Sequence, residues 1–177
     1  MLRLPLLLTA LATPIAQPAN AQEQSPIALQ EHGVICTINL QGQQPAPDTE
    51  TGHINVIDET RGIDVFTDQV PAHLGLSFGI RTVLSKGAIL DGVRISVTHP
   101  PMGPERITQQ SWEASLHSGA SALNLFTFED THELVQGTWI FQLTFAGNIL
   151  SEQRFEVTPP GSVPTVQYAC QDDALTS

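Results

Sequence analysis

Histidine is the residue type in this chain best suited to metal-ligand chemistry. Six histidines occur in 177 residues, and the neutral imidazole is a common ligand for zinc and copper. His132 alone has several carboxylates nearby in the sequence, namely Glu129, Asp130 and Glu133. The other five stand one to a segment, without the i, i+2 strand spacing that would aim two rings at one ion: His32, His53, His73, His99 and His117. We therefore predict surface histidines and no metal site. A carrier that uses these histidines for a metal or small ligand is the alternative.

The segment His99–Pro104, His-Pro-Pro-Met-Gly-Pro, has the features of a recognition loop. Three prolines in six residues fix φ and reduce the entropy lost on binding. His99 and Met102 would offer a polar and a soft apolar contact beside Pro100 and Pro101. A rigid crossover between strands, which needs no partner, would use the same prolines. These four residues are the binding candidates that the sequence provides.

No sequence pattern here is typical of an enzyme. A serine hydrolase needs Gly-x-Ser-x-Gly or an equivalent elbow that opens a helix, and His117-Ser118-Gly119 fits only a turn. The sequence also contains no phosphate loop, dinucleotide fingerprint, EF-hand loop or His-Glu-x-x-His. A catalytic triad assembles in space and escapes such a scan, but we expect no enzymatic activity, no catalytic residue and no cofactor.

The first 21 residues have the three parts of a secretory signal peptide. Arg3 is the positive n-region, residues 4–12 form the apolar h-region, and residues 19–21 read Ala-Asn-Ala, an A-x-A cleavage pattern. The apolar run is about half the roughly 20 residues that a spanning helix needs, so no transmembrane segment is expected. Gln22 follows, rather than a cysteine that would carry a lipid. The sequence predicts a periplasmic or secreted protein after cleavage near Ala21.

The two cysteines, Cys36 and Cys170, are predicted to form a disulfide. An oxidising compartment turns an isolated pair into a bridge. The loop that it closes would cover most of the chain, which the chain-entropy account values at about 5 kcal/mol. Such a bridge would tie the C-terminal tail to the first strand. A redox or metal thiol pair is the alternative, but CxxC spacing is missing.

Composition and charge are typical of one globular domain that avoids nucleic acid. Of the residues, 41% are hydrophobic and 14% charged, and 18 acidic against 7 basic residues give a net charge of −11. Removal of the signal peptide removes Arg3, so the mature balance is 18 acidic against 6 basic residues, or −12. No basic stripe offsets the repulsion from phosphates. Residues 22–177 suffice for one core.

Alternating hydrophobicity predicts an all-β fold. Apolar residues recur at every second position in the expected strands: Gly33–Leu40, Ile54–Ile57, Leu74–Arg81, Val93–Thr98, Trp112–Leu116, Leu123–Phe128, Thr138–Phe145 and Ile149–Val157. Pro100 and Pro101 should end a strand because neither donates to a ladder. Gly147-Asn148 should form a two-residue hairpin turn. About seven or eight strands favour one antiparallel, immunoglobulin-like β-sandwich over residues 22–177, with a small antiparallel barrel as the alternative.

The remaining segments are predicted to be irregular. They comprise a long loop near 41–53, the stretch 58–71 and a C-terminal tail over 159–177, and no segment shows a sustained 3.6-residue period. Trp112, Trp139 and most phenylalanines fall on inner strand faces and are interpreted as core. A ligand groove lined by aromatic residues is the alternative.

Several of these segments together resemble a known family. They lie within roughly Leu74 to Thr158 and comprise His99–Met102, Trp112, Phe126–Glu129, Glu133–Phe141 and Phe155–Val157. The set is similar to a family of exported bacterial proteins whose domain has no assigned function. The resemblance implies a single β-domain of immunoglobulin-like character. It implies no activity, and no catalytic residue can be transferred from it.

The sequence thus predicts an exported, non-catalytic β-sandwich that binds a protein or envelope component. The contact candidates are residues 99–104 and the acidic surface. The alternative is a periplasmic metal or small-ligand carrier that uses histidines. No nucleic-acid partner is expected, and the sequence sets no oligomeric state.

Overall fold

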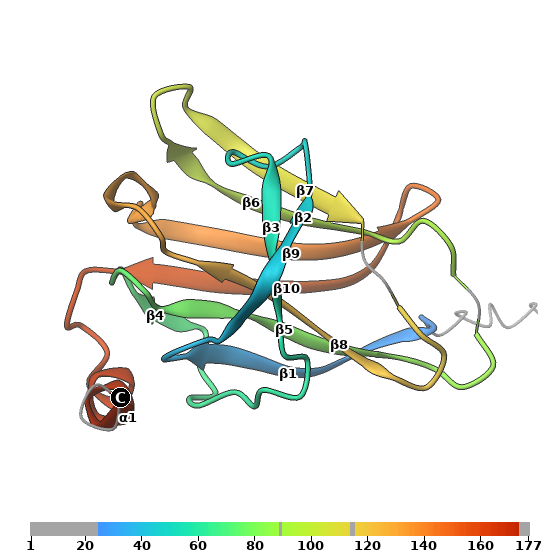
Figure 1. Cartoon of the computed structure of the whole chain (residues 1–177), viewed down its shortest axis with the longest axis horizontal. Helices are drawn as coiled ribbons and strands as arrows, with labels where there is room; N and C mark the ends of the chain where they lie inside the picture. Colours follow the sequence, from blue (N-terminus) through green and yellow to red (C-terminus); the bar gives the residue numbers. More distant parts are fainter. Residues whose placement is uncertain (1–24, 89, 114–115, 174–177) are drawn as a thin grey trace, which may run out of the picture.

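The computed structural model describes residues 25–173 except 89 and 114–115, so the predicted signal peptide lies outside the described residues. These residues form ten strands, one 3₁₀ helix and one α-helix (Figure 1). In chain order they are β1 (Ile27–Ile35), β2 (Leu40–Pro45), β3 (His53–Ile57), β4 (Gln69–Pro71), β5 (Ser77–Leu84), β6 (Arg94–Met102), β7 (Ile107–Glu113), β8 (Ser121–Thr127), η1 (Thr131–Glu133), β9 (Gly137–Phe145), β10 (Asn148–Thr158) and α1 (Pro164–Asp173).

The strands form a two-layer sandwich with an added hairpin. One sheet has the order β1-β5-β8, the other has the order β4-β10-β9-β6-β7, and β2 pairs with β3 separately. All pairs are antiparallel except β4 with β10, which is parallel. In Figure 1 the β2–β3 hairpin runs across the direction of the other strands. The predicted β-sandwich is confirmed, and the alternative of a closed barrel is wrong because the described sheets stay open.

The core lies between the two sheets and is built around Phe78 of β5. Its ring centroid lies 5.3 Å from that of Phe155, 5.5 Å from Trp139 and 5.7 Å from Phe141, which belong to the opposite sheet. The ring of Phe128, which directly follows β8 in the same sheet as β5, lies 5.3 Å from the ring of Phe78. All five side chains are at most 1% exposed. The three contacts to the opposite sheet are edge-to-face, an arrangement that adds about 0.5–1.5 kcal/mol per pair beyond area burial. The interpretation of these aromatic residues as core is confirmed.

Strand β5 is buried on both faces rather than on one as predicted. The side chain of Arg81 explains the second buried face. Its Nε lies 3.0 Å from Oε2 of Glu31, its Nη1 donates to the carbonyl of Glu59 at 2.6 Å, and its Nη2 donates to the carbonyl of Arg61. The irregular segment 58–66 therefore covers the outer face of the three-stranded sheet.

Two predicted segments near the N-terminus are wrong in their boundaries. The strand expected at 33–40 is instead the end of β1 and the start of β2, and β1 already begins at Ile27 within a polar stretch. The predicted loop near 41–53 contains most of β2 and the first residue of β3. Every residue of β2 is exposed, so no apolar alternation marks it.

The turn between β9 and β10 is displaced by one residue from its prediction. Phe145 pairs with Asn148, so Ala146 and Gly147 form the two-residue loop. Both have positive φ, 48° and 80°. Those angles match the type I′ turn, whose twist fits the right-handed twist of the flanking strands.

The predicted C-terminal tail contains a helix. Pro164 begins α1, where its fixed φ and missing N–H fit the first helical position. Val163 and Val166 pack onto the core at 9% and 2% exposure. Ten residues are too few to show a sustained helical period in the sequence. In the described part of the chain, no helix is long and apolar enough to cross a membrane.

Candidate functional site

The four predicted binding residues lie at the end of β6, and two of them are buried. His99 is 4% exposed and Met102 1%, whereas Pro100 is half-buried and Pro101 is exposed. Pairing of β6 with β9 ends at Thr98, and pairing with β7 skips residues 99–101 and resumes at Met102. The strand therefore does not end at the prolines as predicted, but its pairing is interrupted there, where the prolines have no N–H to donate. His99 and Met102 belong to the interior and do not offer surface contacts, while binding by the segment as a whole stays a prediction.

His99 takes part in a buried polar chain. Its ring stacks on Trp139 with the centroids 4.6 Å apart. Nδ1 donates to the carbonyl of Pro100 at 2.9 Å, and Nε2 lies 3.4 Å from Nε2 of Gln110. The same Gln110 accepts a hydrogen bond from the Glu50 N–H through Oε1 at 2.9 Å. Desolvation lowers the pKa of His99, so the buried ring is neutral near pH 7.

Next to these buried polar contacts of His99, the structure brings together Glu50, His132 and Glu133, which we call the Glu-His-Glu cluster. Glu50 lies in the turn between β2 and β3, and the other two residues lie in η1. One candidate ligand atom from each residue lies within 4.8 Å of the others. Nε2 of His132 lies 3.0 Å from Oε1 of Glu50, and its Nδ1 lies 3.2 Å from Oδ1 of Asp130. A Cβ at Gly103 would clash with Oε1 of Glu50, so glycine allows this close approach.

Glu133 is the buried member of the cluster, at 6% exposure. Its Oε2 accepts hydrogen bonds from the N–H of Asp130 at 2.8 Å and from the N–H of Glu129. This is the reciprocal half of a capping box at the start of η1. Desolvation raises the pKa of Glu133, while the two backbone donors act in the opposite direction.

His132 connects the cluster to solvent. Its side chain is 39% exposed, against 21% for Glu50. The hydrogen bond to Glu50, and after it the bond to Asp130, raises the pKa of His132 because both carboxylates favour the charged ring. The cluster thus joins the hairpin turn to η1 through a contact that small solutes can reach.

A groove of about 120 Å³ opens between the β2–β3 hairpin and two sheet edges, formed by β7 and β8. Its apolar wall includes Trp112 and Phe126, both half-buried. Glu133 and Glu129 line it as well, so it adjoins the Glu-His-Glu cluster. Trp112 and Phe126 therefore line a groove, as in the alternative interpretation of the aromatic residues, while the fully buried rings around Phe78 form the core.

Polar groups in the groove include a donor without a partner. Nδ2 of Asn124 is buried and has no hydrogen-bond partner within the described residues, while its Oδ1 accepts from Nε1 of Trp112 at 3.4 Å. Nδ2 of Asn55 donates to Oε1 of Glu129 at 2.7 Å and so ties the hairpin to the end of β8. A cavity of about 150 Å³ holds one benzene, so this groove accepts one ring-sized group rather than a whole cofactor.

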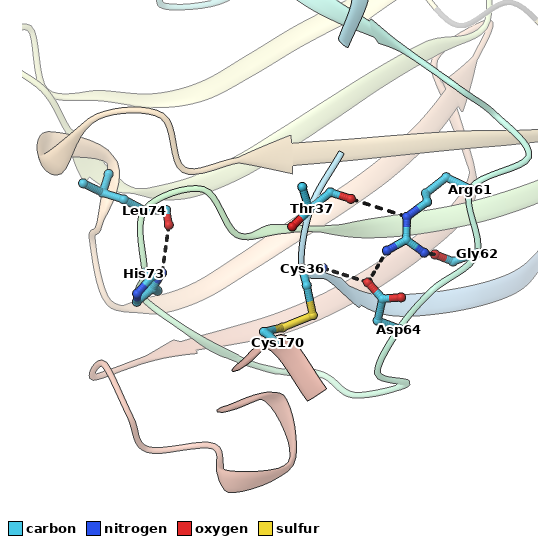
Figure 2. The surroundings of a disulfide bond; sticks show 8 residues. All are labelled: Cys36, Thr37, Arg61, Gly62, Asp64, His73, Leu74 and Cys170. Atoms are coloured by element: carbon cyan, nitrogen blue, oxygen red, sulfur yellow. Dashed lines mark hydrogen bonds and ion pairs between the residues drawn. A yellow bond between two sulfur atoms is a disulfide. The ribbon is translucent and has the colours of Figure 1, made fainter. Parts of the chain in front are cut away.

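The predicted disulfide joins α1 to the end of β1 (Figure 2). The Cα atoms of Cys36 and Cys170 lie 5.1 Å apart across 134 positions of sequence. The N–H of Cys36 donates to Oδ2 of Asp64 at 2.9 Å, and Arg61 pairs with the same oxygen. The bridge therefore also rests against the 58–66 segment.

Comparison with known families identifies the domain. A family model described as a domain of unknown function (DUF3859) matches residues 23–157. The chain belongs to this family. The DUF3859 match includes both sheets, the groove and the Glu-His-Glu cluster, and it ends before α1 and Cys170. No curated protein matches the chain. The resemblance to a family of unknown function is confirmed.

A solved structure similar to this DUF3859 chain is the crystal structure of an immunoglobulin-like protein from Pseudomonas aeruginosa. The two share 23% sequence identity with a TM-score of 0.53, and the match covers 77% of this chain and 99% of that chain. At this identity the likeness concerns the fold. It confirms the predicted immunoglobulin-like character of the sandwich.

Several residues of this DUF3859 site carry no signal in the sequence. Glu50, Gln110 and Asn124 stand in segments with no motif, and only the folded chain places them beside β7, β8 and η1. His132 and its neighbouring carboxylates were recognisable, because they are close in sequence. The residue that the sequence did not indicate is Glu50, which contacts His132 from the turn between β2 and β3.

Proposed function

We propose that this DUF3859 protein is an exported, non-catalytic module that binds a basic segment of a partner protein in the cell envelope. Export is supported by the signal-peptide pattern at residues 1–21 and by the Cys36–Cys170 bridge, which suits an oxidising compartment. The immunoglobulin-like fold is compatible with a binding module, although fold alone assigns no function.

The groove beside β7 and β8 is the observation that carries the proposal. It is open, lies along two sheet edges, and at about 120 Å³ has room for one side chain. Small-molecule and cofactor pockets usually measure about 300–1,000 Å³. The size therefore favours a side chain presented by a larger partner over a free cofactor.

The lining of the groove favours a cationic side chain. Glu129 and Glu133 supply carboxylates, and Trp112 and Phe126 supply aromatic rings. Lysine and arginine carry a charge that pairs with carboxylates and is attracted to aromatic faces within about 6 Å of the ring centre. The mature chain carries 18 acidic against 6 basic residues, which would also steer a basic partner toward it.

Site-directed photocrosslinking in the native host tests this function. A photoreactive phenylalanine replaces Thr51, which lines the groove and is exposed, and a matched control replaces Tyr168 on α1, which is 77% exposed. We expect position 51 to capture one envelope protein that position 168 does not capture. The captured peptide should contain lysine or arginine at the crosslink.

Charge variants complete the experiment. Glu129→Gln keeps the shape of the groove and its acceptor for Asn55 but removes one charge, so it should reduce capture at position 51 severalfold. Glu156→Gln removes one charge from an exposed position on β10 and should leave capture unchanged. Equal capture from positions 51 and 168, a captured peptide without a basic residue, or no response to Glu129→Gln would each contradict the proposal.

A further inference from the structure

We propose that Glu50, His132 and Glu133 form a binding site for one divalent transition-metal ion of the zinc type. The inference depends on the ligand set of the Glu-His-Glu cluster and needs no partner protein. Glu133 also lines the groove, so a bound ion would leave Glu129 as the carboxylate available there. One imidazole and two carboxylates from the hairpin turn and η1 provide three protein ligands. Three such ligands with an open fourth position are the usual arrangement of accessible zinc sites.

The spacing of the ligand atoms suits a common ion. Nε2 of His132 and Oε1 of Glu50 lie 3.0 Å apart, and one ligand atom from each of the three residues lies within 4.8 Å of the other two. Tetrahedral ligands at about 2.0–2.1 Å from zinc are roughly 3.3 Å from one another. The first pair already has this separation to within a few tenths of an ångström, whereas the Glu133 carboxylate would have to turn inward by up to about 1.5 Å.

The second coordination shell is already in place. Nδ1 of His132, the ring nitrogen that would not bind the metal, lies 3.2 Å from Oδ1 of Asp130. A metal-bound histidine almost always donates its other N–H to a carboxylate, a carbonyl or water, which fixes the ring orientation. Glu133 is fixed similarly, because its Oε2 accepts hydrogen bonds from two backbone N–H groups.

One carboxylate oxygen in the cluster is buried without a partner in the described part of the protein. Oε2 of Glu50 is buried and makes no hydrogen bond within the described residues. Burying a carboxylate oxygen without a donor is costly, and buried charges are normally paired or bind metal. The unpaired oxygen of Glu50 therefore points to a cation.

The class of metal follows from the ligands. Imidazole suits zinc, copper, iron and nickel, whereas carboxylate ligands without nitrogen suit magnesium and calcium. One nitrogen with two oxygens favours zinc or a similar divalent ion. The side chain of His132 is 39% exposed, so an ion can enter from solvent and keep a water at its fourth position.

This inference departs from the sequence-based expectation of no metal site. That expectation rested on the wide spacing of the histidines, and the described chain does contribute a single histidine to this cluster. The missing ligand is Glu50, a carboxylate from the hairpin turn. A bound ion would tie that turn to η1 and so brace one side of the groove.

Zinc titration of the purified, unreduced chain tests the site. Isothermal titration calorimetry and native mass spectrometry should both show one zinc ion per chain. His132→Ala and Glu50→Gln should each weaken binding at least roughly tenfold, and Asp130→Asn, which leaves the ligands intact, should weaken it about tenfold. His73→Ala, which removes an exposed histidine outside the cluster, should leave affinity unchanged.

X-ray absorption of the zinc-loaded chain gives a readout of the ligands themselves. It should show one imidazole and otherwise oxygen neighbours at about 2.0–2.2 Å. Circular dichroism of each variant establishes that the fold is intact. Failure to bind zinc, binding that survives both His132→Ala and Glu50→Gln, or binding lost equally in His73→Ala would overturn the proposal.

Discussion

Removing the disulfide is predicted to destabilise the whole sandwich. In the Cys36→Ser/Cys170→Ser variant the unfolded chain regains the freedom of a loop of 134 positions. The chain-entropy relation gives about 17 cal/mol/K for a loop of this length, or about 5 kcal/mol at 25 °C. Typical domains have unfolding free energies of about 5–15 kcal/mol, so this loss is a large fraction of the total.

Equilibrium urea unfolding, followed by circular dichroism and tryptophan fluorescence, measures the effect. The variant should unfold at a much lower urea midpoint, and its melting temperature should fall by roughly 10–20 °C for a chain of this size. Wild-type protein with a reducing agent should behave in the same way. The matched control Val166→Ala keeps the bridge but removes buried helix packing, and should cost only about 2 kcal/mol.

Two results would refute this reasoning. A loss below about 1 kcal/mol with an unchanged urea slope would show that the bridge does not restrict the unfolded chain as the loop argument requires. A separate early transition of α1, with the midpoint of the sandwich unchanged, would show that the bridge holds only the helix. In either case the bridge would be a local attachment.

Two further predictions concern the interior of the sandwich. Desolvation lowers the pKa of His99 below its unfolded value of about 6.5. The stability that the neutral ring supports is therefore fully present above about pH 6.5. As the pH falls below that value, the free energy of unfolding should decrease by up to about 1.4 kcal/mol per pH unit. Urea titrations at several pH values between about 7.5 and 5.5 measure this dependence of the unfolding free energy on pH. The dependence should be shallower for His99→Gln, and an equal dependence would exclude His99 as the cause. Gly79→Ala places a Cβ against the carbonyl oxygen of Asn124 and should lower the free energy of unfolding by about 1–3 kcal/mol. In the control Gly62→Ala the new Cβ meets nothing within 4 Å, so the same assay should show a change of less than about 0.5 kcal/mol.

Strands with one buried face were the predictable part of this fold. Thr138–Phe145 was expected as a strand and β9 spans Gly137–Phe145. The large apolar residues Trp139, Phe141 and Leu143 stand at every second position and are all fully buried. The same reasoning recovered β10. In these strands one sequence pattern reports directly on one packed face.

Elements without such a face could not be predicted. The six residues of β2 are all exposed, and β4 has three residues, so neither carries a detectable alternation. α1 depends on its bridge and on two valines, Val163 and Val166, more than on its own amphipathic pattern. These elements are set by tertiary contacts that a local pattern does not contain.

The candidate site was predictable only where its residues are neighbours in sequence. His132, Asp130 and Glu133 were recognised together, and the structure keeps them together in and beside η1. Glu50 was not predicted because its approach depends on the hairpin turn and on the space left by Gly103. In the proline segment, stiffness is visible in the sequence, whereas the burial of His99 and Met102 is not.

The Cys36–Cys170 bridge also determines how the molecule would respond to mechanical load. A tensile force between residues 27 and 173 would detach β1 from β5 and then pass directly from one sulfur to the other. The 134 positions inside the bridge, a fully extended length of about 450 Å, would carry none of that force. In a single-molecule pulling experiment, the reduced chain would release this hidden length and the oxidised chain would not.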